Sequence, residues 1–376
     1  MKKKLRVGLI FGGRSGEHQV SLMSAQGVMS ALDKEKYTVV PIGITKDGRW
    51  LASGDPMKAL SSGAAAESSP AALLAEPSLR GLMRLEEDGP QQDLTAVPVS
   101  QLDVVFPILH GPYGEDGTIQ GLLELAGLPY VGAGVAASAV GMDKALFKDI
   151  MRAHDLPVVP DLVIKRKTWE QHLEETLARI EAKIGYDCFV KPANLGSSVG
   201  ITKAHNRTDL RAALSEAARF DRKLIVEVAV DAREIEVSVL GNDVPIASLP
   251  GEIVPCNEFY DYAAKYLNGE SELRIPAPIP RQMTDLVRRL AVEAYLAIDC
   301  AGMARADFLV DRQTDEVYIN EVNTLPGFTP ISMYPKLWEA TGISYAELID
   351  RLIELALERY QDKGRTATAY QVPDRD

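Results

Sequence analysis

The sequence predicts an α/β fold with a parallel sheet at the start of the chain, followed by two α+β units. Up to about residue 130, short apolar strands alternate with helical segments, which is typical of βαβ units. Beyond residue 230 the strands are longer and alternate between apolar and polar residues. A chain of 376 residues is also too long for one hydrophobic core, so we expect two or three domains.

The first expected domain, residues 1–139, holds the alternating strands and helices. Its basic start, MKKKLRVGLIFGG, has only a short apolar run that contains glycines, so it reads as a first buried strand and not as a signal peptide. Residues 52–96 are rich in Ala, Ser, Gly and Pro, and we expect an excursion that holds a strand or a helix. The other expected elements are strands at 37–44 and 103–111 and helices at 21–32 and 118–127.

The second and third expected domains cover residues 140–230 and 231–366, and residues 367–376 read as a loose tail. A helix over 141–155 opens the second domain, and an extended segment bounded by prolines follows it. The other elements expected here are strands at 162–164, 187–192, 200–204, 223–230, 233–241, 243–253, 303–311 and 316–324, and helices at 169–184, 207–220, 281–296 and 345–360.

Composition and charge favour a soluble cytoplasmic protein without a nucleic-acid or membrane partner. The 41 Lys and Arg against 53 Asp and Glu give a net charge of −12, which opposes general electrostatic binding of nucleic acid. A local basic cleft for a polyphosphate is compatible with this charge. No segment reaches the apolar length of a membrane span. Cys188, Cys256 and Cys300 are scattered and lack a C-x-x-C spacing, so we expect free thiols in a reducing compartment.

A strand that ends in Lys191 runs into a loop of small residues in FVKPANLGSSVGI, residues 189–201. The backbone N–H groups of such a loop can approach a phosphate closely, because few side chains stand in the way. Lys191 would supply the positive charge. An ordinary turn at the end of a hairpin explains the same residues, and this stretch alone does not separate the two interpretations.

Two carboxylates and an amide are expected to converge in a hairpin formed by MARADFLVDRQTDEVYINEVNT. If its strands pair around Thr314, Asp307 lies opposite Glu321. Arg305 then shares a face with Asp307, and Asn323 with Glu321, because side chains alternate along a strand. Carboxylate and amide oxygens suit Mg²⁺ shared with substrate phosphates, whereas zinc would require His or Cys nearby. The competing interpretation is the polar outer face of an amphipathic hairpin.

The lysine loop and the acidic hairpin together predict phosphoryl transfer from a nucleotide whose phosphates bridge the lysine and the metal. No Walker-type G-x-x-x-x-G-K-[ST] sequence and no protein-kinase signature is present. A loose dinucleotide fingerprint at residues 132–137, with Asp155 further on, would instead indicate an oxidoreductase. That interpretation leaves Lys191 and the acidic hairpin without a purpose.

Eight stretches of the sequence form a recognisable set, in the order GGRSGEHQVS (12–21), HGPYGEDGTIQG (110–121), MDK (142–144), FVKPANLGSSVG (189–200), VEVAVDAREIEV (226–237), FYDYAAKY (259–266), RADF (305–308) and NEVNTLPGFTPIS (320–332). Together they resemble the D-alanine–D-alanine ligases of the ATP-grasp superfamily, from the first strand to nearly the C-terminus. The resemblance implies an ATP-grasp fold of three domains, in which an N-terminal substrate-binding domain precedes two α+β units that sandwich ATP.

The resemblance implies a site for ATP and for two Mg²⁺ or Mn²⁺ ions. Lys144 and Lys191 would hold the phosphates, and the small-residue loop would close over them. Glu227 would accept the adenine amino group and Glu234 the ribose hydroxyls. By the same resemblance the ATP-binding residues are Lys144, Lys191, Ser198, Glu227, Ala229, Val230 and Glu234, and the metal ligands are Asp307, Glu321 and Asn323.

The resemblance also implies groups that act on the first substrate. Glu17 resembles the carboxylate that pairs with the ammonium of the first D-alanine. His110 resembles the histidine near its carboxylate. Arg305 and the backbone N–H of Gly327 would stabilise negative charge that develops on the reacting carboxyl group.

For the second substrate, Lys265 and Ser332 resemble the groups that bind its carboxylate. Tyr266, with Ser197 and Glu17, resembles a hydrogen-bonded trio that ties a loop over the site. Depsipeptide-forming members, which use D-lactate, depart from the family pattern at Lys265 and Tyr266, so the sequence AAKY favours D-alanine as second substrate.

The implied reaction has two steps, phosphorylation of the first D-alanine by ATP and attack on the acyl phosphate by the amine of the second. Closed loops would keep water from the acyl phosphate. The dipeptide would serve peptidoglycan synthesis, and the family implies a homodimer. The alternatives are a ligase that uses D-lactate and a nucleotide-binding protein without catalysis.

Overall fold

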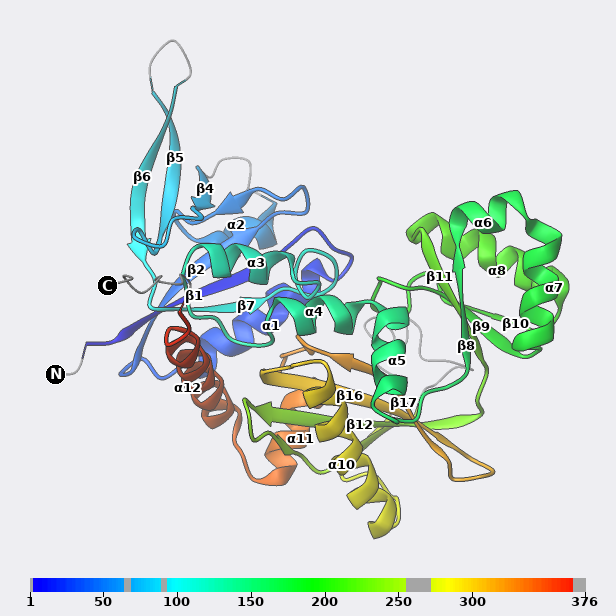
Figure 1. Ribbon diagram of the computed structural model, residues 1–376. Coiled ribbons are helices and arrows are strands. Elements are labelled where there is room, and N and C mark those ends of the chain that lie inside the picture. Colours follow the sequence, from blue (N-terminus) through cyan, green and yellow to red (C-terminus); the bar gives the residue numbers. More distant parts are fainter. Residues whose placement is uncertain (1–2, 64–68, 89–92, 255–271, 368–376) are drawn as a thin grey trace, which may run out of the picture.

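The computed structural model describes residues 3–63, 69–88, 93–254 and 272–367 and contains three β-sheets that follow one another along the chain (Figure 1). The domain boundaries placed at residues 139 and 230 stay predictions. Three residues singled out in the sequence, Cys256, Lys265 and Tyr266, lie outside the described ranges, and so does the expected tail from residue 368 on.

The first sheet is parallel at one side and antiparallel at the other. Its strands are β1 (Leu5–Gly12), β2 (Tyr37–Ile44), β3 (Trp50–Leu51), β4 (Pro70–Leu73), β5 (Gly81–Asp88), β6 (Asp93–Gln101) and β7 (Val104–Ile108), in the order β6-β5-β4-β3-β2-β1-β7. β1 pairs in parallel with both β2 and β7, which confirms the parallel sheet expected at the start of the chain.

The excursion at residues 52–96 extends this sheet instead of forming a separate unit. It contributes the short helix α2 (Pro56–Ser62) and strands that pair antiparallel beside β3. β5 and β6 form a hairpin that projects away from the body of the molecule (Figure 1). The expected strand or helix is therefore present: the described residues of this range include both α2 and strands of the first sheet.

Tight turns bring two predicted site residues to the same edge of this sheet. Gly12 has φ +92, and a Cβ there would lie 2.1 Å from the Ile44 carbonyl oxygen, so only glycine fits where β1 turns toward α1 (His18–Ala31). Glu17 stands at the N-cap of α1, and His110 follows the neighbouring strand β7. Both side chains thus come from the carboxyl ends of adjacent parallel strands, where α/β folds bind ligands.

Three helices connect the first sheet to the second, namely α3 (Thr118–Leu125), α4 (Val135–Met142) and α5 (Lys144–Ala153). The helix predicted from residue 141 begins at Lys144 instead. Asp143 is extended, with φ −91 and ψ 94, and its side chain accepts hydrogen bonds from the backbone N–H groups of Ala145 and Leu146. This cap fixes Lys144 as the first residue of α5.

The second sheet has four strands in the order β10-β9-β11-β8 and carries its helices as a separate lobe (Figure 1). The helix predicted over 169–184 is interrupted at His172, where φ −132 and ψ 52 leave the helical region. The elements of this lobe are β8 (Asp161–Lys165), α6 (Arg166–Gln171), α7 (Leu173–Lys183), β9 (Cys188–Pro192), β10 (Thr202–Ala204), α8 (Arg207–Phe220) and β11 (Lys223–Val228).

The third sheet has six strands, with the order β15-β14-β12-β16-β17 and with β13 beside β12. Its strands are β12 (Ala232–Gly241), β13 (Ile246–Ala247), β14 (Gly251–Val254), β15 (Glu272–Arg274), β16 (Gly302–Asp311) and β17 (Val317–Asn323), and the helices are α10 (Arg281–Ala297), α11 (Met333–Thr341) and α12 (Tyr345–Lys363). β16 and β17 form the predicted antiparallel hairpin.

The last helix, α12, packs on the first sheet as well as on the third sheet, which precedes it in sequence (Figure 1). Its buried residues Leu348, Leu352 and Ile353 belong to the same hydrophobic cluster as Val7 of β1 and Phe106 of β7. The first core is therefore completed by residues from near the other end of the chain.

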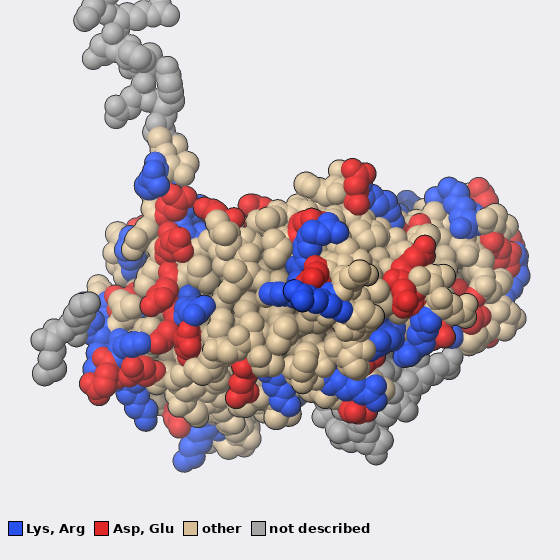
Figure 2. All heavy atoms as spheres, turned by 90° about the horizontal axis from the view of Figure 1, so that it is seen from below, with Lys and Arg blue, Asp and Glu red and all other residues tan. Residues whose placement is uncertain are grey.

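Over the residues that the structure describes, the helices are all too short or too polar to cross a lipid bilayer. On the face shown in Figure 2, Lys and Arg side chains are interspersed with Asp and Glu side chains. This face therefore has a mixed charge rather than a single sign.

Candidate nucleotide and metal site between two sheets

A cleft of about 600 Å³ lies between the second and third sheets and gathers most of the predicted ATP and metal residues. Its lining includes Lys144, Lys191, Ser197, Ser198, Glu227, Ala229, Val230, Glu234, Arg305, Asp307 and Glu321. These residues come from distant parts of the sequence, and the two sheets bring them together.

Three carboxylates stand in a row across the third sheet at one wall of this cleft. Asp307 of β16 lies opposite Glu236 of β12 on one side and opposite Glu321 of β17 on the other. Directly opposed residues project from the same face, so the three side chains point the same way. The predicted pairing of Asp307 with Glu321 is confirmed, and the structure also places Arg305 opposite Asn323.

A β-bulge makes this row possible. From Val310 to Phe308 the hairpin pairs in one register, with Phe308 opposite Ile319, and the register then shifts so that Asp307 faces Glu321. Asn320 is the extra residue. If the first register continued without this shift, Glu321 would stand opposite Ala306 and project from the other face, because side chains alternate along a strand.

Two cations lie against the carboxylate row. The Arg305 guanidinium donates to both oxygens of Asp307, at 2.7 Å each, and its Nε lies 2.9 Å from Glu236. Burial alone would lower the pKa of Arg305, but Asp307 and Glu236 raise it above the usual value. Lys144 Nζ lies 3.6 Å from Glu321 and donates to the Leu195 carbonyl at 2.7 Å. The site thus places fixed positive charge beside the predicted metal ligands.

The predicted ligands fit a hard divalent cation that takes part of its coordination from a substrate. Asn323 Nδ2 lies 3.0 Å from Asp307 Oδ2, so the amide and the two carboxylates of the hairpin converge. Within the described ranges, no three His, Cys, Asp or Glu side chains form a group that could hold a metal by themselves. Further oxygen ligands would have to come from Asn323, water or phosphate, as is usual for Mg²⁺.

Lys191 stands on the opposite wall of the cleft, formed by the second sheet, and pairs there with Glu227. Ile225 stands opposite Lys191 in the β9–β11 pairing, so Glu227, two residues further along, shares the same face. Lys191 Nζ lies 2.6 Å from Glu227 Oε2, and Lys148 Nζ of α5 lies 2.6 Å from Oε1. Burial opposes ionisation of Glu227, but the two lysines outweigh it and hold its pKa at about 2.

The small-residue loop after β9 has a strained backbone that reaches toward the first domain. Ser197 and Ser198 have φ +53 and +57, in the left-handed region that non-glycine residues seldom adopt. A Cβ on Gly196 would lie 3.6 Å from Glu17 Oε2, so the loop runs close to the predicted substrate carboxylate. The Ser197 hydroxyl is buried and has no hydrogen-bond partner among the residues that are described.

His110 and Ser24 hold the loop that carries Gly327. His110 Nδ1 lies 3.1 Å from the Leu325 carbonyl oxygen and therefore donates to it. Burial lowers the pKa of His110, against the influence of Glu17, so the imidazole is neutral. Ser24 Oγ accepts from the backbone N–H of Phe328 at 3.3 Å. These two hydrogen bonds fix the backbone on either side of Gly327.

Ser332 lies on the same turn as Gly327. Its hydroxyl accepts from the Thr329 backbone N–H at 3.1 Å and lies 2.7 Å from the Thr329 hydroxyl. A Cβ on Gly327 would lie 3.1 Å from Ser332 Oγ, so the two residues are close neighbours.

Sequence reasoning missed four polar residues that take part in this arrangement. Glu236, Glu115, Lys148 and Ser24 were not assigned a role, although the first three lie inside or next to motifs that were recognised. Glu115 accepts from the Gly111 backbone N–H at 2.8 Å and is close to Glu17. The signal that could have found Lys148 is its spacing of four residues from Lys144, which places both on one face of a helix.

Glu115→Gln is expected to make the folded protein lose less stability as the pH rises from 5 to 8. Burial, and then Glu17, raise the pKa of Glu115 from 4.5 to about 8. The folded protein therefore keeps a proton that the unfolded chain has already lost, and stability falls as the pH rises through this range, by at most about 1.4 kcal/mol per pH unit. Glutamine is neutral throughout.

Thermal unfolding at pH 5, 6.5 and 8.5 would measure this difference. Glu339→Gln, on the exposed face of α11, is the matched control. Equal pH slopes for Glu115→Gln and the unmodified protein would contradict the assignment of the raised pKa to Glu115.

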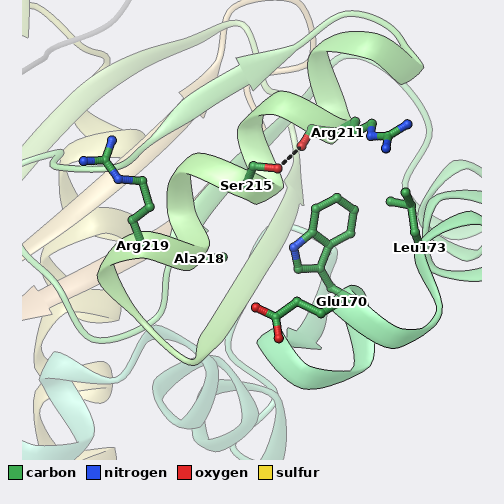
Figure 3. Close-up of a pocket in the computed structure, with 7 residues that line it drawn as sticks. Glu170, Leu173, Arg211, Ser215, Ala218 and Arg219 are labelled. Carbon is green, nitrogen blue, oxygen red and sulfur yellow. Dashed lines mark hydrogen bonds between the residues drawn. The ribbon is translucent and has the colours of Figure 1, made fainter.

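A second, more open hollow lies on the outside of the second lobe (Figure 3). It is formed between α6, the start of α7 and α8, and Arg211 and Arg219 stand at its two ends and point away from each other (Figure 3). None of the residues that the sequence singled out lines it. Its lining residues are Trp169, Glu170, Leu173, Arg211, Ser215, Ala218 and Arg219.

Comparison with known proteins gives consistent matches over nearly the whole chain. A family model described as D-ala D-ala ligase N-terminus matches residues 6–133, and one described as D-ala D-ala ligase C-terminus matches residues 150–354. A D-alanine--D-alanine ligase of Heliobacterium modesticaldum is 53% identical over 365 residues, which cover 97% of this chain and 98% of that protein. One from a Thermoanaerobacter species is 54% identical over 367 residues, covering 97% and 99%.

Solved structures match as well. The D-alanine-D-alanine ligase from Coxiella burnetii has a TM-score of 0.81 at 35% identity and covers 96% of both chains. The VanG D-Ala:D-Ser ligase from Enterococcus faecalis has a TM-score of 0.81 at 34% identity, and the match covers 94% of this chain and 100% of that chain.

Proposed function

The chain belongs to the D-alanine–D-alanine ligases, which have the ATP-grasp fold, and we propose that it joins two D-alanines into D-alanyl-D-alanine with conversion of ATP to ADP and phosphate. One observation carries this proposal for the site. Two lysines and a row of three carboxylates from separate segments converge on one cleft between two sheets. Such a cleft suits a triphosphate held by positive charge and by a metal.

In this proposal ATP lies in the cleft with its base toward the second sheet. Glu227, with the backbone of Ala229 and Val230, would receive the adenine, and Glu234 the ribose hydroxyls. Lys144 and Lys191 would hold the phosphates, with Ser198 in the loop above them. The left-handed backbone at Ser197 and Ser198 supports this role, because strained loops of small residues occur where a ligand is gripped.

Mg²⁺ or Mn²⁺ would be held by Asp307, Glu321 and Asn323, and it would neutralise charge on the transferring phosphoryl group. The oxygen-only ligand set supports a hard cation, and the family implies two ions. The Arg305 guanidinium already contacts Asp307, and it would turn partly toward the reacting carboxyl group.

The first D-alanine would lie between the first sheet and the end of the cleft. Its ammonium would pair with Glu17, and its carboxylate would face Arg305 and the Gly327 N–H. His110 would act mainly through Leu325, since its Nδ1 hydrogen bond holds the backbone of that loop. The position of this loop decides where the Gly327 N–H points.

The second D-alanine would bind at Ser332 and at Lys265, with Tyr266, Ser197 and Glu17 closing the site. The hydroxyl of Ser332 belongs to a compact turn beside Gly327, which supports a place next to the reacting carboxyl group. The amine of the second substrate would then attack the acyl phosphate, while the closed loops exclude water.

We also propose, from family membership, that the protein is a cytoplasmic homodimer whose dipeptide product enters peptidoglycan synthesis. Light scattering of the purified protein tests the dimer, and a monomer at micromolar concentration would contradict it.

The function is tested by measuring ADP release and product masses with Mg-ATP and D-alanine. Parallel reactions contain L-alanine, D-alanine with D-lactate, and D-alanine with D-serine, since one structural relative is described as a D-Ala:D-Ser ligase. We expect D-alanyl-D-alanine as the main product in each reaction that contains D-alanine. A mixed product would overturn the choice of second substrate, and no ADP release would favour a nucleotide-binding protein without catalysis.

A further inference from the structure

Lys148 lies behind the nucleotide cleft and contacts it only through another side chain. It is on α5, four residues after Lys144, and its side chain is 1% exposed. Its Nζ lies 2.6 Å from Glu227 Oε1 and donates to the Val159 carbonyl at 3.2 Å. Lys148 is absent from the lining of the cleft, whereas Lys144, Lys191 and Glu227 belong to it.

Glu227 is bound at both of its carboxylate oxygens by lysines. Lys148 occupies Oε1 and Lys191 occupies Oε2, each at 2.6 Å. Each oxygen of an ionised carboxylate can accept two hydrogen bonds, so the lysines do not by themselves prevent Glu227 from accepting the adenine amino group. Lys191, however, must leave Glu227 Oε2 if it is to hold the phosphates.

The two lysines differ in where they can go. Lys191 lines the cleft and can turn to the phosphates, whereas Lys148 is enclosed and has no route to the ligand. If Lys191 moves away, Lys148 is the remaining partner of a buried carboxylate. Without Lys148, Glu227 would be left buried and unpaired, which is strongly unfavourable, so Lys191 would stay on Glu227.

We propose that Lys148 is a positioning residue that keeps the Glu227 carboxylate charged and oriented, so that Lys191 can exchange from Glu227 to the phosphates while Oε2 accepts the adenine amino group. This inference rests on the proposed roles of Glu227 and Lys191. The exchange links recognition of the base to binding of the phosphates. Glu227 Oε2 binds Lys191 before ATP is present and accepts from the adenine amino group afterwards.

The surrounding charges support this division. Burial lowers the pKa of Lys148, whereas Glu227 raises it, and Lys191 and Arg152 lower it further. Arg152 pairs with Asp161, which stands opposite Glu227 on β8. Burial lowers the pKa of Lys191, but Glu227, and after it Glu321 and Glu234, raise this pKa above its usual value. Glu227 thus attracts both lysines, and Glu321 and Glu234 of the cleft attract Lys191 in addition.

The test compares ATP with purine riboside 5′-triphosphate, which lacks the 6-amino group. For Lys148→Met we expect KM for ATP to rise roughly tenfold, kcat at saturating ATP to stay within about threefold, and the preference for ATP over the analogue to fall toward one. Lys183→Met, an exposed lysine of α7, is the matched control and should retain the preference.

A double variant separates positioning from a general structural role. If Lys148 acts through Glu227, then Lys148→Met combined with Glu227→Gln should be no worse than Glu227→Gln alone, because the effects of coupled residues do not add. The double variant also removes both buried charges, so it keeps the test possible where Lys148→Met alone does not fold. Thermal unfolding is followed for every variant.

Two results would overturn the inference, and they differ in what else they affect. The first result is that Glu227→Gln loses the preference for ATP but Lys148→Met keeps it, or that the effects of the two substitutions on KM simply add in the double variant. In that case Lys148 has no positioning role, while the proposed ATP site stands. If the unmodified protein releases phosphate equally well with either nucleotide, the role of Glu227 fails and this inference with it.

Discussion

Glu321→Gln is expected to reduce kcat by at least about a hundredfold while the protein remains folded. Glutamine keeps the size of the side chain but removes the charge at one end of the carboxylate row formed with Asp307 and Glu236. A divalent cation would bind more weakly, so the Mg²⁺ concentration at half-maximal activity should rise. Activity measured as a function of Mg²⁺ concentration, together with a thermal unfolding curve, gives both quantities.

The control for this variant lies in the same hairpin. Glu316 is exposed in the turn between β16 and β17, and Glu316→Gln should leave both kcat and the Mg²⁺ requirement nearly unchanged. Normal turnover of a folded Glu321→Gln protein would remove the metal assignment of Asp307, Glu321 and Asn323.

Arg305→Lys is expected to lower kcat by roughly a hundredfold to a thousandfold, which is the usual cost of losing one donor to a developing oxyanion. Lysine preserves the positive charge beside Glu236 and Asp307 but lacks the planar fork that holds both oxygens of Asp307 at 2.7 Å. KM for ATP should change much less than kcat. Steady-state kinetics with saturating D-alanine measures the two parameters separately.

Arg305→Ala distinguishes charge from geometry. It leaves Glu236, Asp307 and Glu321 side by side with one cation fewer, so the melting temperature should drop clearly, whereas Arg305→Lys should melt close to the unmodified protein. Arg289→Lys, on an exposed face of α10, controls for the substitution itself. A kcat for Arg305→Lys within threefold of the original would argue against the oxyanion role.

The acidic hairpin could be predicted from the sequence because its turn and its alternation are local features. Pairing around Thr314 gave the correct partner for Asp307. The bulge at Asn320 could not be predicted. The residues near the turn pair in a different register, and no feature of the amino-acid sequence indicates where the register shifts. Simple symmetry about the turn predicts the pairing of Asp307 with Glu321. In the structure this pairing results from the shift of register between Asp307 and Phe308.

The lysine behind Glu227 escaped prediction for a different reason. Lysine is rarely buried, so a lysine in an amphipathic helix is first assigned to the solvent face. Lys148 is buried because Glu227 approaches it from β11, a strand far away in sequence. Long-range pairs of this kind depend on how the sheets are arranged, which local periodicity does not contain. The roles of Lys265 and Tyr266 stay predictions, as these residues lie outside the described ranges.

The packing of α12 on the first sheet has a consequence for how the protein is made in the cell. A ribosome adds about 5–20 residues per second, so roughly 12–50 s pass between completion of β7 and the appearance of Leu348 and Leu352. During that interval the nascent chain exposes the apolar surface of Val7 and Phe106 that α12 later covers. The hydrophobic core of the part that is synthesised first is thus among the last to be completed. Until then its exposed apolar surface can bind chaperones.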